Sequence, residues 1–81
     1  METRSLSTIA AEISRDWKPV SYAAAPYLSA MRSLGSITDS YGADEGRSVV
    51  AYFLSNAGSW RGDVARRVKA ELNKMLKASY K

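Results

Sequence analysis

The stretch from Tyr52 to Gly62 constrains the fold most, because it ends one apolar helix, turns and begins a basic one. Gly58 is a typical helix terminator, and the Ser59 hydroxyl is suited to capping the helix that follows. Trp60 is the largest side chain near the turn. The sequence therefore predicts a packed corner, with a helix starting at Ser59 and Trp60 fixing the angle between the two helices.

Apolar residues recur at helical spacing on both sides of this corner. We expect Asp44 to cap the helix before it, since aspartate is favoured at that position. The two predicted apolar stripes are Val49, Val50, Phe53, Leu54 and Ala57, and then Trp60, Val64, Val68, Leu72 and Met75.

A helix over residues 6–17 is predicted by a third apolar stripe. Ser5 is suited to be its N-cap, and Pro19 stops it because the residue before a proline avoids helical dihedrals. Its stripe consists of Leu6, Ile9, Ala10, Ile13 and Trp17.

A second helix follows, with Ser21 as its cap and an irregular first turn, because a proline at position 26 lacks a backbone N–H. We expect this helix to be regular from Pro26 and to end at Gly35. The next few residues are expected to form a short helical turn, with Ile37 and Tyr41 pointing inward, and Gly42 is expected to break this turn.

These elements predict an all-α fold, a compact bundle of three main helices plus a shorter helix or turn. The chain is short enough for one domain over residues 1–81, with residues 1–5 and 79–81 frayed. It contains no cysteine, so packing alone must stabilise it. No apolar run approaches the roughly 20 residues that span a bilayer, and no signal-peptide block follows the polar N-terminus, so we expect a cytoplasmic protein without membrane contact.

The composition argues against an enzyme. Histidine, the commonest general base, is absent, and so is the cysteine thiolate nucleophile. Glu12 and Asp16 stand four residues apart and would share a helix face, where a carboxylate pair could do acid–base work or hold a metal. A solvated face beside Arg15 is the simpler interpretation. We therefore predict no catalytic residue, no metal ligand and no cofactor.

The net charge of +4 is carried by the last helix, which makes its basic face the candidate surface for an anionic partner. A face of this kind can also be merely solvated. The candidate partner-binding or nucleic-acid-binding residues are Arg61, Arg66, Arg67, Lys69, Lys74 and Lys77.

The corner also looks like a helix-turn-helix, since a short glycine-containing turn precedes a basic helix. The positions relative to Gly58 argue against this motif. Leu54 stands where the motif usually has a small residue, and Arg67 stands where it usually has an apolar one. Non-specific contact with phosphates needs only clustered charge. Tyr22, Tyr41 and Tyr52 are hard to place in one core, and any that are exposed together would form a protein-binding patch.

Several segments resemble small uncharacterised proteins encoded by bacteriophages and mobile elements of Gram-positive bacteria and actinobacteria. The resemblance covers most of residues 6–76. It implies an accessory protein in the cytoplasm of the host bacterium, without a known activity. The matching segments are Asp16-Trp17-Lys18, Ala25-Pro26-Tyr27-Leu28-Ser29-Ala30-Met31, Tyr52-Phe53-Leu54-Ser55-Asn56-Ala57 and Trp60-Arg61-Gly62.

We therefore expect a non-enzymatic protein that binds an unknown host or phage protein. Its candidate surface is Arg61 with Arg66, Lys69 and neighbouring tyrosines. A homodimer is a related expectation, because a small bundle can bury leftover apolar surface against a second copy. The alternative is a small basic protein that binds nucleic acid through the last helix.

Overall fold

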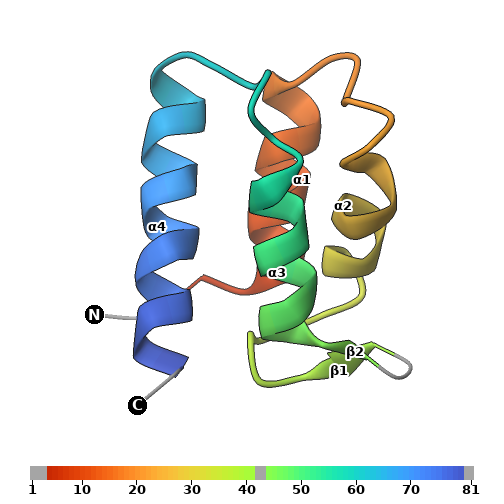
Figure 1. The fold of residues 1–81 in the computed structure, drawn as a ribbon, viewed down its shortest axis with the longest axis vertical. Coiled ribbons are helices and arrows are strands. Elements are labelled where there is room, and N and C mark those ends of the chain that lie inside the picture. Colours follow the sequence, from red (N-terminus) through yellow and green to blue (C-terminus); the bar gives the residue numbers. More distant parts are fainter. Residues whose placement is uncertain (1–3, 42–43, 80–81) are drawn as a thin grey trace.

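Four helices form an up-down-up-down bundle in the computed structural model, which describes residues 4–41 and 44–79 (Figure 1). Successive helices run in opposite directions, and the last one returns beside the first. The predicted all-α fold is confirmed. The helices are α1 (Leu6–Asp16), α2 (Ala25–Met31), α3 (Gly46–Ser55) and α4 (Asp63–Ser79).

Helix α1 begins where the sequence predicts and ends one residue earlier than predicted. Ser5 has an extended backbone, and its hydroxyl accepts a hydrogen bond from the Thr8 N–H at 3.1 Å, as an N-cap does. The helix ends at Asp16, since Trp17 turns to φ −100° and ψ 95° shortly before Pro19.

The irregular turn before α2 is also confirmed, but Ser21 is not the cap of the helix, because the N-cap is Ala24. Ser21 instead holds the preceding turn together. The Ser21 carbonyl accepts from the N–H groups of Ala24 and Ala25 at 3.0 and 2.9 Å, and its hydroxyl accepts from Ala23 at 3.3 Å. Pro26 then lies within the first turn of α2, where its missing N–H costs least.

The predicted end of α2 at Gly35 is wrong, since the helix ends at Met31. The N–H groups of Ser33 and Leu34 donate to the carbonyls three residues back, at 3.0 and 3.1 Å. These tight bonds end the α-helical pattern well before the glycine.

The link after Gly35 forms a turn organised by Asp39, not the expected helical turn. The Asp39 carboxylate accepts from the N–H groups of Gly35 and Ser36, both at 3.0 Å. The carboxylate therefore takes the place of the backbone carbonyls to which these two N–H groups would donate in a helix. Ile37 packs against the core as predicted, whereas the side chain of Tyr41 lies outside the described residues.

Two short strands, β1 (Ser40–Tyr41) and β2 (Asp44–Glu45), pair in antiparallel fashion before α3. The prediction that Asp44 caps α3 is wrong, because Asp44 belongs to β2. Glu45 is the residue at the N-cap, and its side chain makes no capping bond. The predicted break at Gly42 lies outside the described residues.

Helix α3 starts at a glycine because two stretches of backbone meet there. The Gly46 N–H donates to the Asp39 carbonyl at 2.6 Å, and a Cβ at Gly46 would lie 2.7 Å from the Ile37 carbonyl oxygen. From this point α3 turns its predicted stripe inward, and Val50 and Phe53 are fully buried.

The predicted start of the last helix at Ser59 is wrong. Helix α3 ends at Ser55 and α4 begins at Asp63, so residues 56–62 form a longer link. Gly62 has φ 113°, a left-handed conformation that cannot continue a helix and that favours glycine. Trp60 therefore belongs to the link and not to the apolar stripe of α4, although its side chain is only 2% exposed.

Three aromatic rings meet at the end of the bundle where this link lies. The Trp60 ring stacks on that of Trp17, with centroids 5.7 Å apart and planes at 11°. Phe53 meets both indoles edge-on, at centroid distances of 6.2 and 6.4 Å. The predicted core role of both tryptophans is confirmed. The other buried side chains are Leu6, Ile9, Ala10, Ile13, Ala24, Leu28, Ala30, Met31, Leu34, Val49, Val50, Ala57, Ala65, Val68 and Leu72.

Candidate functional site

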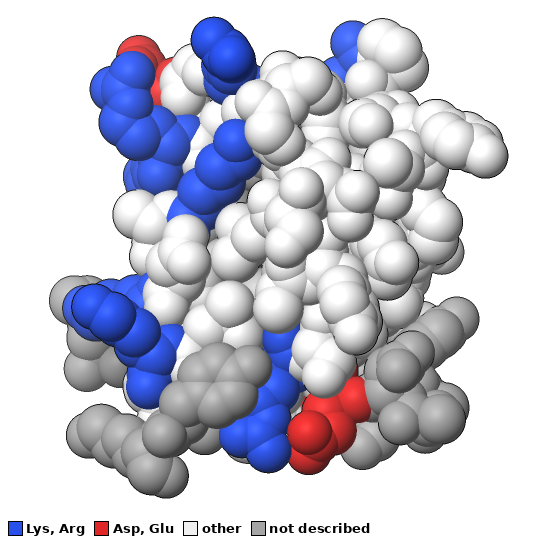
Figure 2. Space-filling model, viewed as in Figure 1, with Lys and Arg blue, Asp and Glu red and all other residues white. Residues whose placement is uncertain are grey.

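On the face shown in Figure 2, basic side chains gather over α4, whereas the surface over α3 and α2 is largely uncharged. Five of the six predicted cations lie on α4, and Arg61 lies in the link before it. The basic residues thus lie on or next to the last helix, as expected, but the six side chains have different surroundings.

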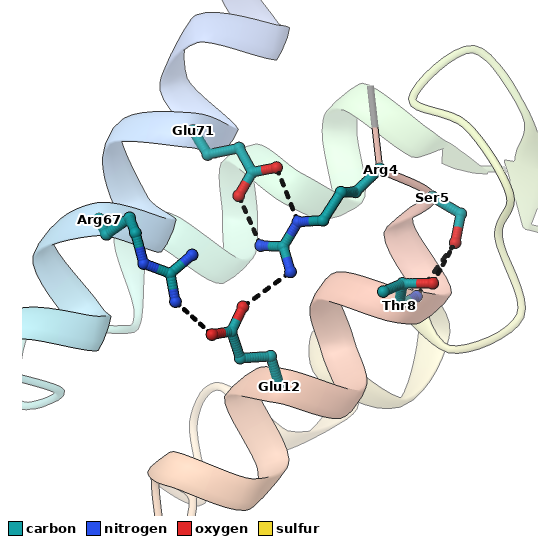
Figure 3. A network of polar contacts seen from close by, with 6 residues as sticks. All are labelled: Arg4, Ser5, Thr8, Glu12, Arg67 and Glu71. Carbon is teal, nitrogen blue, oxygen red and sulfur yellow. Dashed lines mark hydrogen bonds and ion pairs between the residues drawn. The ribbon is translucent and has the colours of Figure 1, made fainter. Parts of the chain in front are cut away.

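Arg67 points to α1 and forms part of the fold (Figure 3). Its guanidinium donates to Glu12, which lies on the facing helix. The pKa of the Glu12 carboxyl lies below its usual range. The hydrogen bond from the Arg67 side chain lowers it most, and the hydrogen bond from Arg4 lowers it further. The solvated face predicted for Glu12 is therefore wrong, because its side chain is only 20% exposed and lies between α1 and α4.

Arg4 completes this network from the segment before α1. It donates to both carboxylate oxygens of Glu71, at 3.0 and 2.6 Å, and lies 2.8 Å from Glu12 (Figure 3). The pKa of the Arg4 guanidinium is raised above its usual range, and its hydrogen bonds to Glu71 are the main cause. The network joins the chain start, α1 and α4, and we call Arg4, Glu12, Arg67 and Glu71 the ion-pair network.

Lys69 is only partly exposed, and its ammonium interacts with the link before α4. Its Nζ donates to the Trp60 carbonyl at 2.6 Å and lies 5.9 Å from the centre of the Trp60 ring. Burial lowers the pKa of Lys69, and the positive charge of Arg61 lowers it further. Two cations of the predicted set thus repel each other at the start of α4.

A hollow of about 320 Å³ opens at this point, and we call it the cationic hollow. Arg61, Arg66 and Lys69 contribute its charge, and the aromatic ring beside it is Trp60 and not one of the expected tyrosines. The Asp63 carboxylate lies 3.6 Å from Arg66, but the two side chains are 98% and 82% exposed, so water weakens this pair. The lining residues are Trp60, Arg61, Gly62, Ala65, Arg66 and Lys69.

Lys74 and Lys77 lie further along α4 and are exposed. They line a separate hollow of about 500 Å³ together with Ala70 and Asn73. Because Arg67 turns to α1 and Lys69 to Trp60, the outward charge on α4 divides into two clusters.

The helix-turn-helix resemblance weakens further in three dimensions. The link over residues 56–62 is longer than the three or four residues of that motif's turn. The later start of α4 does bring Arg66 into its first turn, where a recognition helix reads bases. However, Asp63 occupies the first position of α4, and Arg67 is paired with α1.

The structure uses both members of the predicted carboxylate pair for its own contacts. Glu12 belongs to the ion-pair network, and the Asp16 carboxylate accepts a hydrogen bond from the Trp60 indole at 2.8 Å. Within the described residues, no group of His, Cys, Asp or Glu side chains is arranged to hold a metal ion.

Sequence reasoning missed the role of Arg4, whereas it had already named Tyr22 and Tyr52 as tyrosines that are hard to place in one core. Arg4 gave no signal, since its partner Glu71 is 67 residues away. Tyr22 was named as a tyrosine without a place in the core, and its side chain is 94% exposed. Tyr52 is 52% exposed, and its ring lies 5.5 Å from that of Tyr27.

In the part of the chain that the structure describes, no helix is both long enough and apolar enough to cross a bilayer. No family model, no curated protein and no solved structure matches this chain. The resemblance to proteins of phages and mobile elements therefore stays a prediction.

Proposed function

We propose that this chain is a non-enzymatic binding protein that holds an acidic or phosphorylated segment of a protein partner in the cationic hollow. The observation that carries the proposal is the convergence of Arg61, Arg66 and Lys69 on one hollow beside Trp60. A cytoplasmic role in a bacterium that carries a phage or mobile element belongs to the same proposal and depends on the sequence resemblance.

An anionic group would relieve the charge crowding at this position. Burial lowers the pKa of Lys69, and the positive charge of Arg61 lowers it further, so these two cations repel each other. The hollow also lies at the N-terminal end of α4, where the helix dipole is positive. Asp63 pairs with Arg66 at 3.6 Å, but this contact is too exposed to neutralise the cations fully.

The division of the basic face favours a protein partner over a nucleic acid. A duplex presents about one phosphate charge per 1.7 Å of its axis and is best matched by a continuous basic strip. Here Arg67 is paired with α1, between the cationic hollow and the pair of Lys74 and Lys77. The cationic hollow instead brings three cations together in one place, which suits one anionic side chain or a short acidic segment.

The surroundings of Glu12 and Asp16 support a non-enzymatic role. Both carboxylates are engaged by Arg4, Arg67 or the Trp60 indole, and so neither is poised to accept a proton from a substrate. This interpretation agrees with the absence of histidine and cysteine from the sequence.

Fluorescence anisotropy with labelled acidic and phosphorylated peptides tests the proposal directly. The double variant Arg61→Glu/Arg66→Glu should bind the best peptide at least about tenfold more weakly, as expected when two charged contacts are lost. The matched control is Lys74→Glu/Lys77→Glu, which changes the charge equally at the other end of α4. Lys69 stays unchanged, because it donates to the Trp60 carbonyl and its loss could disturb the fold.

Equal loss of binding in both variants would overturn the hollow as the site. Duplex DNA and single-stranded RNA should be measured alongside, at low and high salt. Tight nucleic-acid binding that falls steeply with salt and weakens equally in both variants would favour the nucleic-acid alternative. With a supporting result, the wild type and the two variants can be used to capture the partner from host lysate.

A further inference from the structure

Tyr22 is presented to solvent on a fixed turn. Its side chain is 94% exposed, more than that of Tyr52, the other large exposed hydrophobic residue in the described part of the chain. The backbone around it is held by the hydrogen bonds that Ser21 accepts, and Ala24 at the end of the turn is fully buried. A tyrosine held in this way offers a large contact area at a low cost in conformational entropy.

Another hollow, of about 340 Å³, lies beside this turn between the end of α1 and α2, and we call it the α1–α2 hollow. Two of the residues that line it, Trp17 and Leu28, are buried in the core. Arg32 donates to the Ser14 hydroxyl at 2.7 Å and so bridges the two helices along one wall. The residues around the opening include Lys18, Pro19, Val20, Ala25, Ser29 and Arg32.

The chemistry of the α1–α2 hollow suits a neutral aromatic ring. Its buried lining residues are apolar, and the charged residues that line it, Lys18 and Arg32, are both cations. Cations at the edge of such a hollow attract the face of an aromatic ring. A carboxylate would lose its hydration against Trp17 and Leu28, whereas a phenol can keep its hydroxyl at the opening.

We propose that the α1–α2 hollow receives Tyr22 of a second copy of this chain, and that two copies exchange these rings in a symmetric dimer. Val20 and Ala25, which stand two and three residues from Tyr22, line the hollow. The exposed ring and the hollow are therefore neighbours. A two-fold axis that relates the two copies can then place Tyr22 of each copy in the α1–α2 hollow of the other. The proposal does not depend on the proposed function, because none of the cationic-hollow residues lines this surface.

Sedimentation equilibrium from about 1 μM to about 1 mM protein tests the dimer. The wild type should show a reversible dimer, and Tyr22→Ala should raise its dissociation constant at least about tenfold, as for a central interface tyrosine. Tyr52→Ala is the matched control, since Tyr52 is exposed but does not line the α1–α2 hollow. Thermal melts should show that both variants remain folded.

A second variant blocks the hollow while leaving the ring in place. Ser29 is exposed and lines the hollow, so Ser29→Trp should fill it and weaken the dimer by a similar factor. Ser55→Trp, at an exposed position on α3, should leave the dimer intact.

Mixing the two defective chains gives the sharpest test. Tyr22→Ala keeps an open hollow and Ser29→Trp keeps its ring, so an equimolar mixture should form a mixed dimer with one of the two contacts. This dimer should be tighter than that of either variant alone and weaker than that of the wild type. A wild type that is monomeric at about 1 mM, a dimer that survives Tyr22→Ala, or a mixture that recovers no association would overturn the proposal.

Discussion

The indole rings of Trp60 and Trp17 stack with their planes at 11° and their centroids 5.7 Å apart. One ring comes from the end of α1 and the other from the link between α3 and α4. This contact fixes the link against the first helix, and so it sets where α4 begins and where Arg61 is placed.

Replacing Trp60 with alanine should destabilise the protein by about 3–5 kcal/mol, because the ring is buried and both Trp17 and Phe53 lose a neighbour. Urea unfolding followed by circular dichroism measures this loss. Tyr52→Ala is the comparison, and it should cost about 1 kcal/mol, because its half-exposed ring mainly contacts Tyr27. Similar losses in the two variants would contradict the central position of Trp60.

The hydrogen bond from the Trp60 indole to Asp16 gives a separate prediction. Asp16→Ala should lower the free energy of unfolding by about 1 kcal/mol, since a partly buried N–H loses its acceptor. In a Trp60→Phe background, which lacks the donor, the same substitution should cost almost nothing. A double-mutant cycle by urea unfolding checks this, and equal costs in both backgrounds would place the role of Asp16 elsewhere.

The presence of the helices could be predicted from the sequence, because the caps and apolar spacing that indicate a helix are local features. The Ser5 cap and the buried Phe53 stripe depend only on residues within a few positions of one another. The start of α4 could not be located in this way. Trp60 stands in helical phase with Val64 and Val68, so spacing alone cannot separate a buried link residue from the first turn of a helix.

The candidate site could be predicted only as a set of charges. Whether a cation faces solvent or another helix is decided by tertiary packing, as the pairing of Arg67 with Glu12 shows. Nothing in the sequence near Arg4 indicates its bonds to Glu71. The cationic hollow likewise depends on the turn at Gly62, which moves Arg61 from the expected helix into the link.

The left-handed backbone of Gly62 leads to a third prediction. Gly62→Ala should destabilise the protein by about 1–2 kcal/mol, because φ 113° is unfavourable for a residue with a Cβ even though the surrounding space is open. Gly58→Ala is the matched control in the same link. The space at Gly58 is also open and its φ lies outside the left-handed region, so alanine there should be neutral or stabilising by about 0.5 kcal/mol. Thermal unfolding should separate the two variants by sign.

The ion-pair network makes stability depend on pH through Glu12. The guanidinium groups of Arg67 and Arg4 lower the pKa of this carboxyl in the folded protein, while the unfolded chain keeps a value of about 4.3. Between these two values the unfolded state binds more protons than the folded state. The contribution of Glu12 is therefore complete above about pH 4.3 and is lost as the pH falls through the lowered pKa.

Glu12→Gln should accordingly destabilise the protein at pH 7, and the difference from the wild type should shrink as the pH is lowered toward 3. Urea unfolding at a series of pH values measures both curves. Glu45→Gln is the control, because Glu45 forms an exposed pair with Arg47 at 3.2 Å whose loss should matter little at any pH. If the Glu12→Gln difference stayed constant with pH, the carboxylate would contribute by packing and not by its charge.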